Sequence, residues 1–150
     1  MKLQVILPAY SQAIDKFRDR VVMALDPACI ILYGSLARGL NTPTSDVDIV
    51  VVADALEEDF LERLAALNRF RDGQTPFELL GYRLGEWEAM MERFHLTVLE
   101  AVFWGIPLHG ETLFEEWRNW LAGWQERGLR REEGYWTLPT PAEKLAVTQS

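Results

Sequence analysis

The sequence has little cysteine and histidine and no long apolar run. Its one cysteine, Cys29, excludes a disulfide within the chain and fits a reducing compartment, so we expect a cytoplasmic protein. Two histidines and one cysteine are too few ligands for a Cys/His zinc site of its own. The longest uncharged apolar stretches, such as residues 28–36, are about half of the ~20 residues that a membrane helix needs. The first residues reach Pro8 too soon for a signal peptide, and we expect no membrane segment.

The sequence also lacks a basic stripe. Lys and Arg number 15 against 23 Asp and Glu, which gives a net charge of −8 and a pI near 4.8. Proteins that follow a long phosphate backbone gain affinity by neutralising phosphates with basic side chains. We therefore expect no long nucleic acid as a ligand. A phosphorylated small ligand stays compatible with this charge if metal ions supply the positive charge.

What is present is ordinary globular material. The 150 residues are 49% hydrophobic and 25% charged, and no repeat or Gly/Ser-rich linker divides them. Strand patterns alternate with helix patterns, which predicts an α/β (α+β) fold with helices packed on one sheet. We place the domain, including its C-terminal helices, at residues 1–127 and a tail at residues 128–150.

Hydrophobic periodicity predicts the individual elements. Apolar stripes at helical spacing predict four helices. They lie at residues 9–25, after a capping-box pattern formed by Asp54 and Glu57, over 87–102 as one long helix, and at 113–124. Buried strands are expected at 29–33, 47–52 and 77–84, and the break at 105–110 suits an edge strand.

The residues that could bind a ligand or take part in a reaction are concentrated within residues 33–52. Gly34-Ser35 ends a buried strand, and the missing Cβ lets backbone N–H groups approach a ligand such as phosphate. Asp46 and Asp48 are two apart on the next strand, so their carboxylates share one face. Unpaired, neighbouring carboxylates in an apolar strand are costly to bury, and a divalent cation offsets that cost. One or two carboxylates plus substrate phosphates are what Mg²⁺ usually binds.

A third carboxylate would complete such a site. Two-metal phosphoryl-transfer sites usually take a further carboxylate from another strand, and Glu78 is the acid inside the third expected strand. If that strand pairs beside 47–52, Glu78 can close the cluster; the alternative is that Glu78 is a surface charge on an edge strand. The sequence thus predicts Asp46, Asp48 and Glu78 as ligands of two Mg²⁺ ions.

The segments Gly-Ser-Leu-Ala-Arg-Gly (34–39) and Ser-Asp-Val-Asp-Ile (45–49) together resemble the minimal nucleotidyltransferases of the DNA polymerase beta superfamily. The resemblance covers about residues 10–110 and implies the nucleotidyltransferase fold, a small mixed sheet flanked by helices, here with a C-terminal helical extension. It further implies that Gly34 and Ser35 hold the β- and γ-phosphates, with Arg38 and Ser45 also at the nucleotide. For Arg38, stabilisation of the loop is the alternative role.

By the same resemblance, the chain would be a magnesium-dependent enzyme that transfers a nucleoside monophosphate, AMP from ATP, to a hydroxyl and releases pyrophosphate. Glu78 would be the neighbour that takes the hydroxyl proton. Minimal members often form the antitoxin half of a pair with a helical HEPN-type ribonuclease, and some transfer AMP to that partner's tyrosine. This is the expected context. The alternatives are a non-catalytic antitoxin or binding protein of the same fold, and a small-molecule transferase that works as a homo-oligomer.

The last expected helix carries three tryptophans at helical spacing, Trp117, Trp120 and Trp124. Such a stripe is either part of the core or, if the chain leaves it uncovered, an exposed patch large enough for an interface with a partner or a second copy. His95 is expected to be a structural histidine within a helix, whereas His109, placed in a loop next to Gly110, gives little indication of a role.

Overall fold

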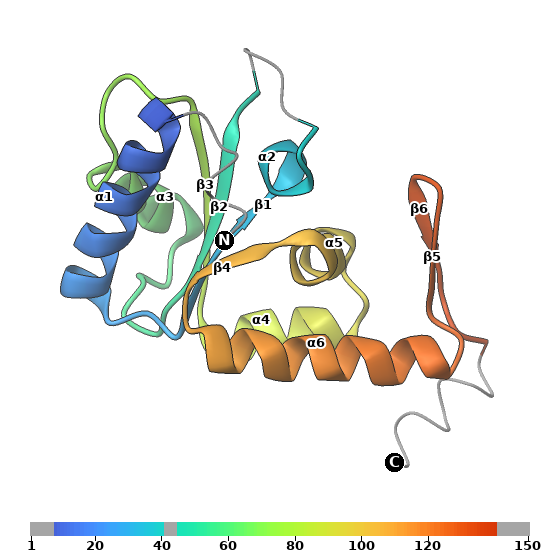
Figure 1. Cartoon of the computed structure of the whole chain (residues 1–150). Helices are drawn as coiled ribbons and strands as arrows, with labels where there is room; N and C mark the ends of the chain where they lie inside the picture. The colour runs from blue at the N-terminus through green and yellow to red at the C-terminus, as the bar shows by residue number, and fades with distance from the viewer. Residues whose placement is uncertain (1–7, 41–44, 141–150) are drawn as a thin grey trace.

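The computed structural model describes residues 8–40 and 45–140 of the chain, and within them helices alternate with strands (Figure 1). The helices are α1 (Pro8–Leu25), α2 (Gly34–Arg38), α3 (Phe60–Asn68), α4 (Leu84–Glu92), α5 (Leu96–Trp104) and α6 (Glu111–Glu126). The strands are β1 (Cys29–Tyr33), β2 (Val47–Val52), β3 (Phe77–Tyr82), β4 (Ile106–His109), β5 (Arg130–Glu132) and β6 (Tyr135–Thr137). None of the described helices combines the length and apolar character that crossing a bilayer demands.

Four strands form one mixed sheet in the order β3-β2-β1-β4. Strand β1 runs antiparallel to both β2 and β4, whereas β2 and β3 are parallel. The end of β1 therefore lies beside the starts of β2 and β3 at one edge of the sheet. The predicted α/β architecture is confirmed, and the strand that begins at Phe77 pairs beside β2, which is the condition that the expectation for Glu78 required.

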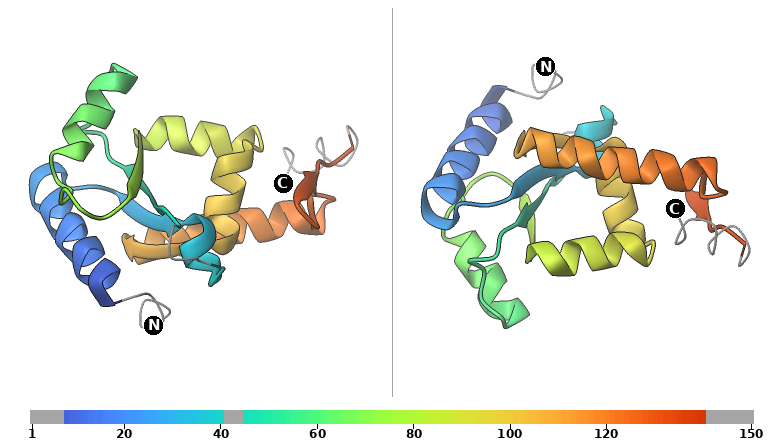
Figure 2. Two further views of the ribbon diagram at one scale, coloured as in Figure 1. Left: turned by 90° about the horizontal axis from the view of Figure 1, so that it is seen from above. Right: turned by 90° about the horizontal axis from the view of Figure 1, so that it is seen from below.

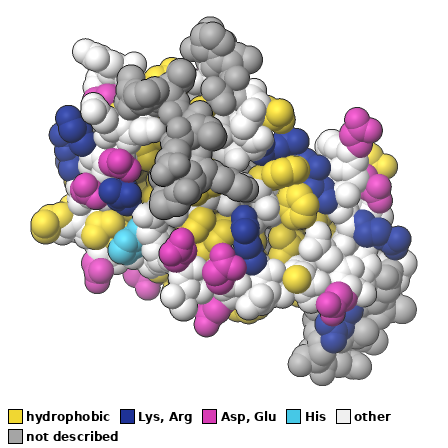
Figure 3. Space-filling model, viewed as in Figure 1, with side chains coloured by type: hydrophobic (Ala, Val, Ile, Leu, Met, Phe, Trp, Pro, Cys, Tyr) yellow, Lys and Arg dark blue, Asp and Glu magenta, His cyan; other side chains and the backbone are white. Residues whose placement is uncertain are grey.

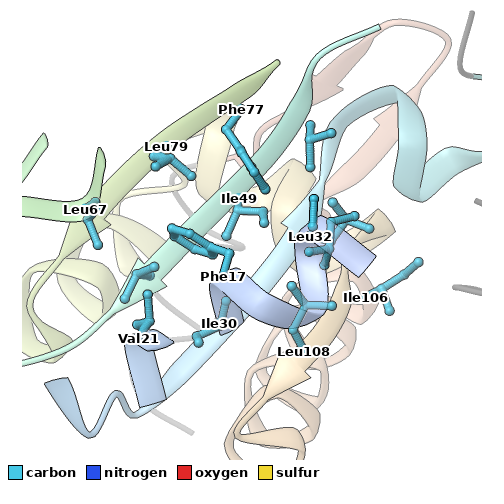
Figure 4. Packing of buried hydrophobic residues seen from close by; sticks show 14 of the residues in the cluster. Phe17, Val21, Ile30, Leu32, Ile49, Leu67, Phe77, Leu79, Ile106 and Leu108 are labelled. Carbon is cyan, nitrogen blue, oxygen red and sulfur yellow. The ribbon is translucent and has the colours of Figure 1, made fainter. Parts of the chain in front are cut away.

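Helices cover both faces of this sheet (Figures 1 and 2). On one face α1 and α3 bury an apolar cluster, in which Phe17 and Phe77 pack with their ring centroids 5.3 Å apart. Figure 4 shows the side chains of β1, β2 and β3 pointing into this cluster, Ile30 and Ile49 among them. On the other face α4, α5 and α6 cover the alternate strand residues, including Ile31 and Val50. This two-sided burial explains why β1 and β2 are apolar almost throughout.

Strands β1 and β2 match the predicted ranges, but the helix expected from Asp54 begins six residues later. The actual N-cap of α3 is Asp59, whose Oδ1 accepts hydrogen bonds from the backbone N–H of Leu61 at 2.8 Å and of Glu62 at 3.1 Å. Asp54 instead accepts one from the N–H of Leu84 at 3.0 Å. Several acids lie before the apolar stripe, and the sequence pattern selected the wrong cap.

The expected single helix over 87–102 is two helices, α4 and α5, that meet at a corner. Phe94 adopts φ +58°, in the left-handed region, and His95 is the N-cap of α5. His95 is thus exposed at a helix start and not within a helix as predicted. Both helices bury their apolar residues in the same cluster, Phe94 included, so the hydrophobic pattern continues through the corner.

Residues after 128, expected as a tail, begin with a β-hairpin formed by β5 and β6. It packs on α5: the guanidinium of Arg131 contacts the carboxylate of Glu100, and the Trp136 ring lies edge-on to Phe103 at 5.5 Å. Residues 141–150 lie outside the described residues.

The tryptophans of α6 differ in environment. Trp117 is fully buried, its ring centroid 5.6 Å from that of Trp87, and its Nε1 donates to Glu88 at 2.9 Å. Trp124 lies edge-on to Phe94 at 5.3 Å. Trp120 is 36% exposed. The core interpretation therefore holds for Trp117, and the interface interpretation is left with Trp120.

Candidate active site

Three polar side chains form a row across the sheet at the edge where β1 ends and β2 and β3 begin. Tyr33 is the register partner of Asp48, and Asp48 is the register partner of Glu78. Residues paired directly across neighbouring strands point to the same face, so this row lies on the face that α4, α5 and α6 cover. Asp46, two residues before Asp48, belongs to the same face and is exposed.

Asp48 is forced close to another acid. Burial, a side-chain hydrogen bond with Glu78 and the negative charges of Glu78 and Asp46 together raise the pKa of Asp48 to about 7. Burial, followed by the charges of the same two neighbours in the row, Asp48 and Glu78, also raises the pKa of Tyr33, so its phenol stays neutral. Without added positive charge, burial and the neighbouring acids therefore favour the neutral form of Asp48.

Gly34 stands directly after this row and has two reasons to be glycine. Its φ is +74°, a region that other residues adopt only with strain. A Cβ there would also overlap the Asp48 side chain, lying 2.9 Å from its Cγ and closer still to Oδ2. The missing side chain therefore lets the start of α2 lie against the Asp48 carboxylate.

Helix α2 carries three of the predicted nucleotide-binding residues to a neighbouring cavity. Gly34, Ser35 and Arg38 line a cavity of about 340 Å³ between α2 and α5. The Arg38 side chain is exposed, and its guanidinium carbon lies 4.6 Å from the centroid of the Trp104 ring. In Figure 3, Lys/Arg and hydrophobic side chains lie next to each other in the region between α5 and the hairpin. The cavity is also lined by Tyr33, Leu40, Leu96, Thr97, Glu100 and Trp104.

The structure thus brings most of the predicted site residues to one edge of the sheet. Asp48 and Glu78 are in contact, and Gly34 lies against Asp48. Ser45 is half-buried just before β2, and Asp46 is exposed beside it. Among the residues that the structure describes, no three carboxylate, imidazole or thiol groups converge as a ready-made metal cage.

The other aromatic and acidic residues around this edge carry no signal in the sequence. The pairing of Tyr33 with Asp48 becomes visible only once the two strands are aligned. Glu100 and Trp104 lie on a helix remote in sequence from the motif, and they share one face because they are four residues apart. No sequence signal connects them to α2.

The donors at this edge fit a divalent cation. Carboxylate oxygens are the ligands that Mg²⁺ prefers, and Asp48 and Glu78 lie close enough to share a hydrogen bond. A cation held between them would favour the ionised form of Asp48 and offset the carboxylate repulsion that, after burial, helps to raise the pKa of Asp48.

Comparison with known proteins agrees with this geometry. The family model "Nucleotidyltransferase domain" matches residues 12–92, more than half of the chain. No curated protein matches. A provisionally named nucleotidyltransferase from Sulfolobus solfataricus is 24% identical, with 52% of this chain and 70% of that chain covered and a TM-score of 0.45. A crystal structure of a toxin–antitoxin with AMP-PNP is 21% identical, with 75% and 93% covered and a TM-score of 0.38.

Nucleotidyltransferase domains generally use divalent metal ions, and the motif residues Gly34, Asp46 and Asp48 fall within the matched range. Together with the mixed sheet and the carboxylates at its edge, the match shows that this chain belongs to the nucleotidyltransferase domain family and is a nucleotidyl-transfer enzyme.

Proposed function

We propose that the chain transfers AMP from ATP to a hydroxyl group on a partner protein, with Mg²⁺ as its metal, as the antitoxin-type half of a pair with a HEPN-type helical protein. The observation that carries the metal-dependent part is the Asp48–Glu78 contact beside Gly34. Two acids in contact, one half-buried and one exposed, make a natural cation site once they are ionised.

In this proposal the tasks are divided among the residues of the candidate site. Asp48 and Glu78 hold Mg²⁺, with Asp46 at the open side of the pair. When bound, Mg²⁺ would neutralise the triphosphate and lower the pKa of the acceptor hydroxyl. The backbone N–H groups at Gly34 and Ser35 receive the phosphates, and Arg38, which lines the same cavity, contacts them with its guanidinium. Catalysis is then mainly positioning and electrostatics.

The transfer step balances without further reactants. The acceptor oxygen attacks the α-phosphorus of ATP, and the bond between that phosphorus and the bridging oxygen to the β-phosphate breaks. Pyrophosphate leaves with the electron pair of that bond. The hydroxyl proton passes to the nearest free carboxylate oxygen, which we assign to Glu78.

Two features support a protein as the acceptor. The net charge of −8 does not suit a long nucleic acid. The cavity beside the carboxylates is bordered by Leu40 and Leu96, each 59% exposed, and apolar side chains at the entrance suit an apolar protein surface more than a polar sugar.

The test is labelled-nucleotide transfer with the variant Asp48→Asn. We expect transfer to fall by roughly 100-fold or more because a metal ligand is lost, while the metal-free protein unfolds at the same temperature or higher because carboxylate repulsion is relieved. Glu115→Gln, at an exposed position of α6, is the matched control. Near-normal transfer by Asp48→Asn would refute the metal assignment, and unchanged melting of the wild-type protein with millimolar ATP and Mg²⁺ would refute the nucleotide site.

A further inference from the structure

The β5–β6 hairpin lies beyond the residues that match the family, and Arg131 and Trp136 of the hairpin both donate hydrogen bonds to Glu100 of α5. Both oxygens of the Glu100 carboxylate accept from the Arg131 guanidinium, Nε to Oε2 at 3.0 Å and Nη2 to Oε1 at 3.1 Å. The indole Nε1 of Trp136 also donates to Glu100 Oε2, at 3.3 Å. A two-pronged contact of this kind fixes orientation as well as distance, so the hairpin holds Glu100 in one conformation.

One turn further along α5, Trp104 connects this contact to helix α2. The guanidinium carbon of Arg131 lies 5.2 Å from the centroid of the Trp104 ring, and that of Arg38 lies 4.6 Å from the same centroid. The two arginines therefore interact with the same aromatic ring. Trp104 and Glu100 both line the cavity that also contains Gly34 and Ser35.

The charges in this chain of contacts explain why Arg131 matters. Glu100 lines the same cavity as Arg38, and a free carboxylate there would attract Arg38 and repel a triphosphate. Arg131 occupies both oxygens of that carboxylate. Arg38 can then stack on Trp104 with its N–H groups available to a ligand.

We propose that Arg131 is a positioning residue of the nucleotide site: it holds Glu100 and Trp104 so that the Arg38 guanidinium faces the triphosphate. The hairpin is then a wall of the site and not a tail. This inference rests on the proposed function in one respect, the role of Arg38 toward phosphate. An arginine that is stacked in advance loses less rotamer freedom when it binds phosphate.

The experiment compares KM and kcat for ATP at saturating Mg²⁺ in four variants. Arg131→Ala should raise KM about 3- to 10-fold, the size of a cation–π or charge contact, with kcat changed less than about twofold. The KM of Arg131→Lys should lie between those of the wild type and Arg131→Ala, because lysine keeps the positive charge but cannot make the two-pronged contact with the carboxylate. The double variant Arg131→Ala/Glu100→Gln should have a KM close to that of the wild type, because the carboxylate that Arg131 balanced is no longer present. Arg130→Ala, at the exposed neighbouring position, should match the wild type.

Three results would overturn the proposal. The first is an unchanged KM in Arg131→Ala. The second is an equal rise of KM when Arg131→Ala is made in an Arg38→Ala background, because a residue that acts through Arg38 adds nothing once Arg38 is gone. The third is a failure of Glu100→Gln to reduce the defect.

A second measurement separates this proposal from the proposed function. If the wild-type chain transferred no nucleotide and bound none, the proposed function would be refuted, but the positioning of Arg38 by Arg131 would not. The positioning would then be read from the NMR shifts of the Arg38 side-chain protons, which the Trp104 ring current displaces. Those shifts should move toward unstructured values in Arg131→Ala and stay in place in Arg130→Ala. Shifts that Arg131→Ala left unchanged would overturn the positioning.

Discussion

At the scale of single residues, the site depends on a space that Gly34 leaves empty. The carboxylate of Asp48 occupies the position where a Cβ on residue 34 would lie. Gly34 also has a positive φ, as does Gly39 at the other end of α2, where a Cβ would meet nothing within 4 Å. The two glycines can therefore be compared directly. A side chain at residue 39 would meet backbone strain alone, whereas a side chain at residue 34 would meet the same strain and also overlap Asp48.

This pair gives a prediction about stability and transfer. Gly39→Ala should lower the free energy of unfolding by about 1–2 kcal/mol, the cost of a left-handed residue with a Cβ. Gly34→Ala should cost more and abolish transfer, because Asp48 has to move. Urea unfolding and labelled-nucleotide transfer measure the two effects. Asp48→Ala in the Gly34→Ala background should recover part of the stability; equal costs for the two glycine variants would contradict the overlap.

The sequence predicted the residues of this site that belong to its local motif. Gly34, Asp48 and Glu78 could be selected because strand patterning fixed β1, β2 and β3, and residue types then suggested their chemistry. Glu100, Trp104 and Arg131 could not be selected, because their proximity to α2 depends on the packing of α5 and on a hairpin that has only three residues in each strand.

At the scale of elements, the hydrophobic pattern predicted the bounds of strands that are buried on both faces, and it did not predict where the chain turns. Strands β1 and β2 are buried on both faces, so their apolar runs mark their bounds. The corner between α4 and α5 is invisible in sequence because Phe94 is apolar and buried while its backbone is left-handed. The hairpin was missed because both strands have only three residues and the first, Arg130–Glu132, is fully charged.

Helix α6 yields a prediction that separates core from interface. Trp117→Ala should lower the free energy of unfolding by about 3–5 kcal/mol, because its ring is fully buried. Trp120→Ala should change it by less than about 1 kcal/mol, because Trp120 is 36% exposed. If α6 docks the partner, Trp120→Ala should weaken the complex without unfolding the chain.

Co-expression with the protein encoded beside this chain, followed by intact-mass measurement of both, tests that docking. The expected result is one AMP added to the partner by the wild-type chain and less by Trp120→Ala. Met23→Ala, at a residue of α1 that is 88% exposed, controls for the loss of an exposed apolar side chain. Equal labelling by Trp120→Ala and the wild type would remove α6 from the interface.

At the scale of the whole molecule, Arg63 joins the two helical layers around the edge strand β3. Its side chain, only 4% exposed, extends from α3, and the guanidinium donates to both carboxylate oxygens of Glu86 on α4, at 2.7 and 3.1 Å. It also donates to the carbonyl oxygens of Gly81 at 3.4 Å and Glu58 at 3.3 Å, and to that of Glu57. Helix α3 covers one face of the sheet and α4 the other, so this cluster connects layers that the sheet separates.

The connection predicts how stability depends on pH. The hydrogen bond with Arg63 is the main cause that lowers the pKa of Glu86 in the folded chain. An acid with a lowered folded pKa adds stability above its unfolded pKa, about 4.3, and that stability is lost as pH falls through the folded value. Glu86→Gln should therefore lower the free energy of unfolding at pH 7 by about 1–3 kcal/mol, because a buried guanidinium loses its charged partner. In urea unfolding the difference from wild type should persist down to about pH 5 and then shrink, while Glu115→Gln shows no such difference; a constant gap at every pH would mean that the charge of Glu86 does not hold the layers together.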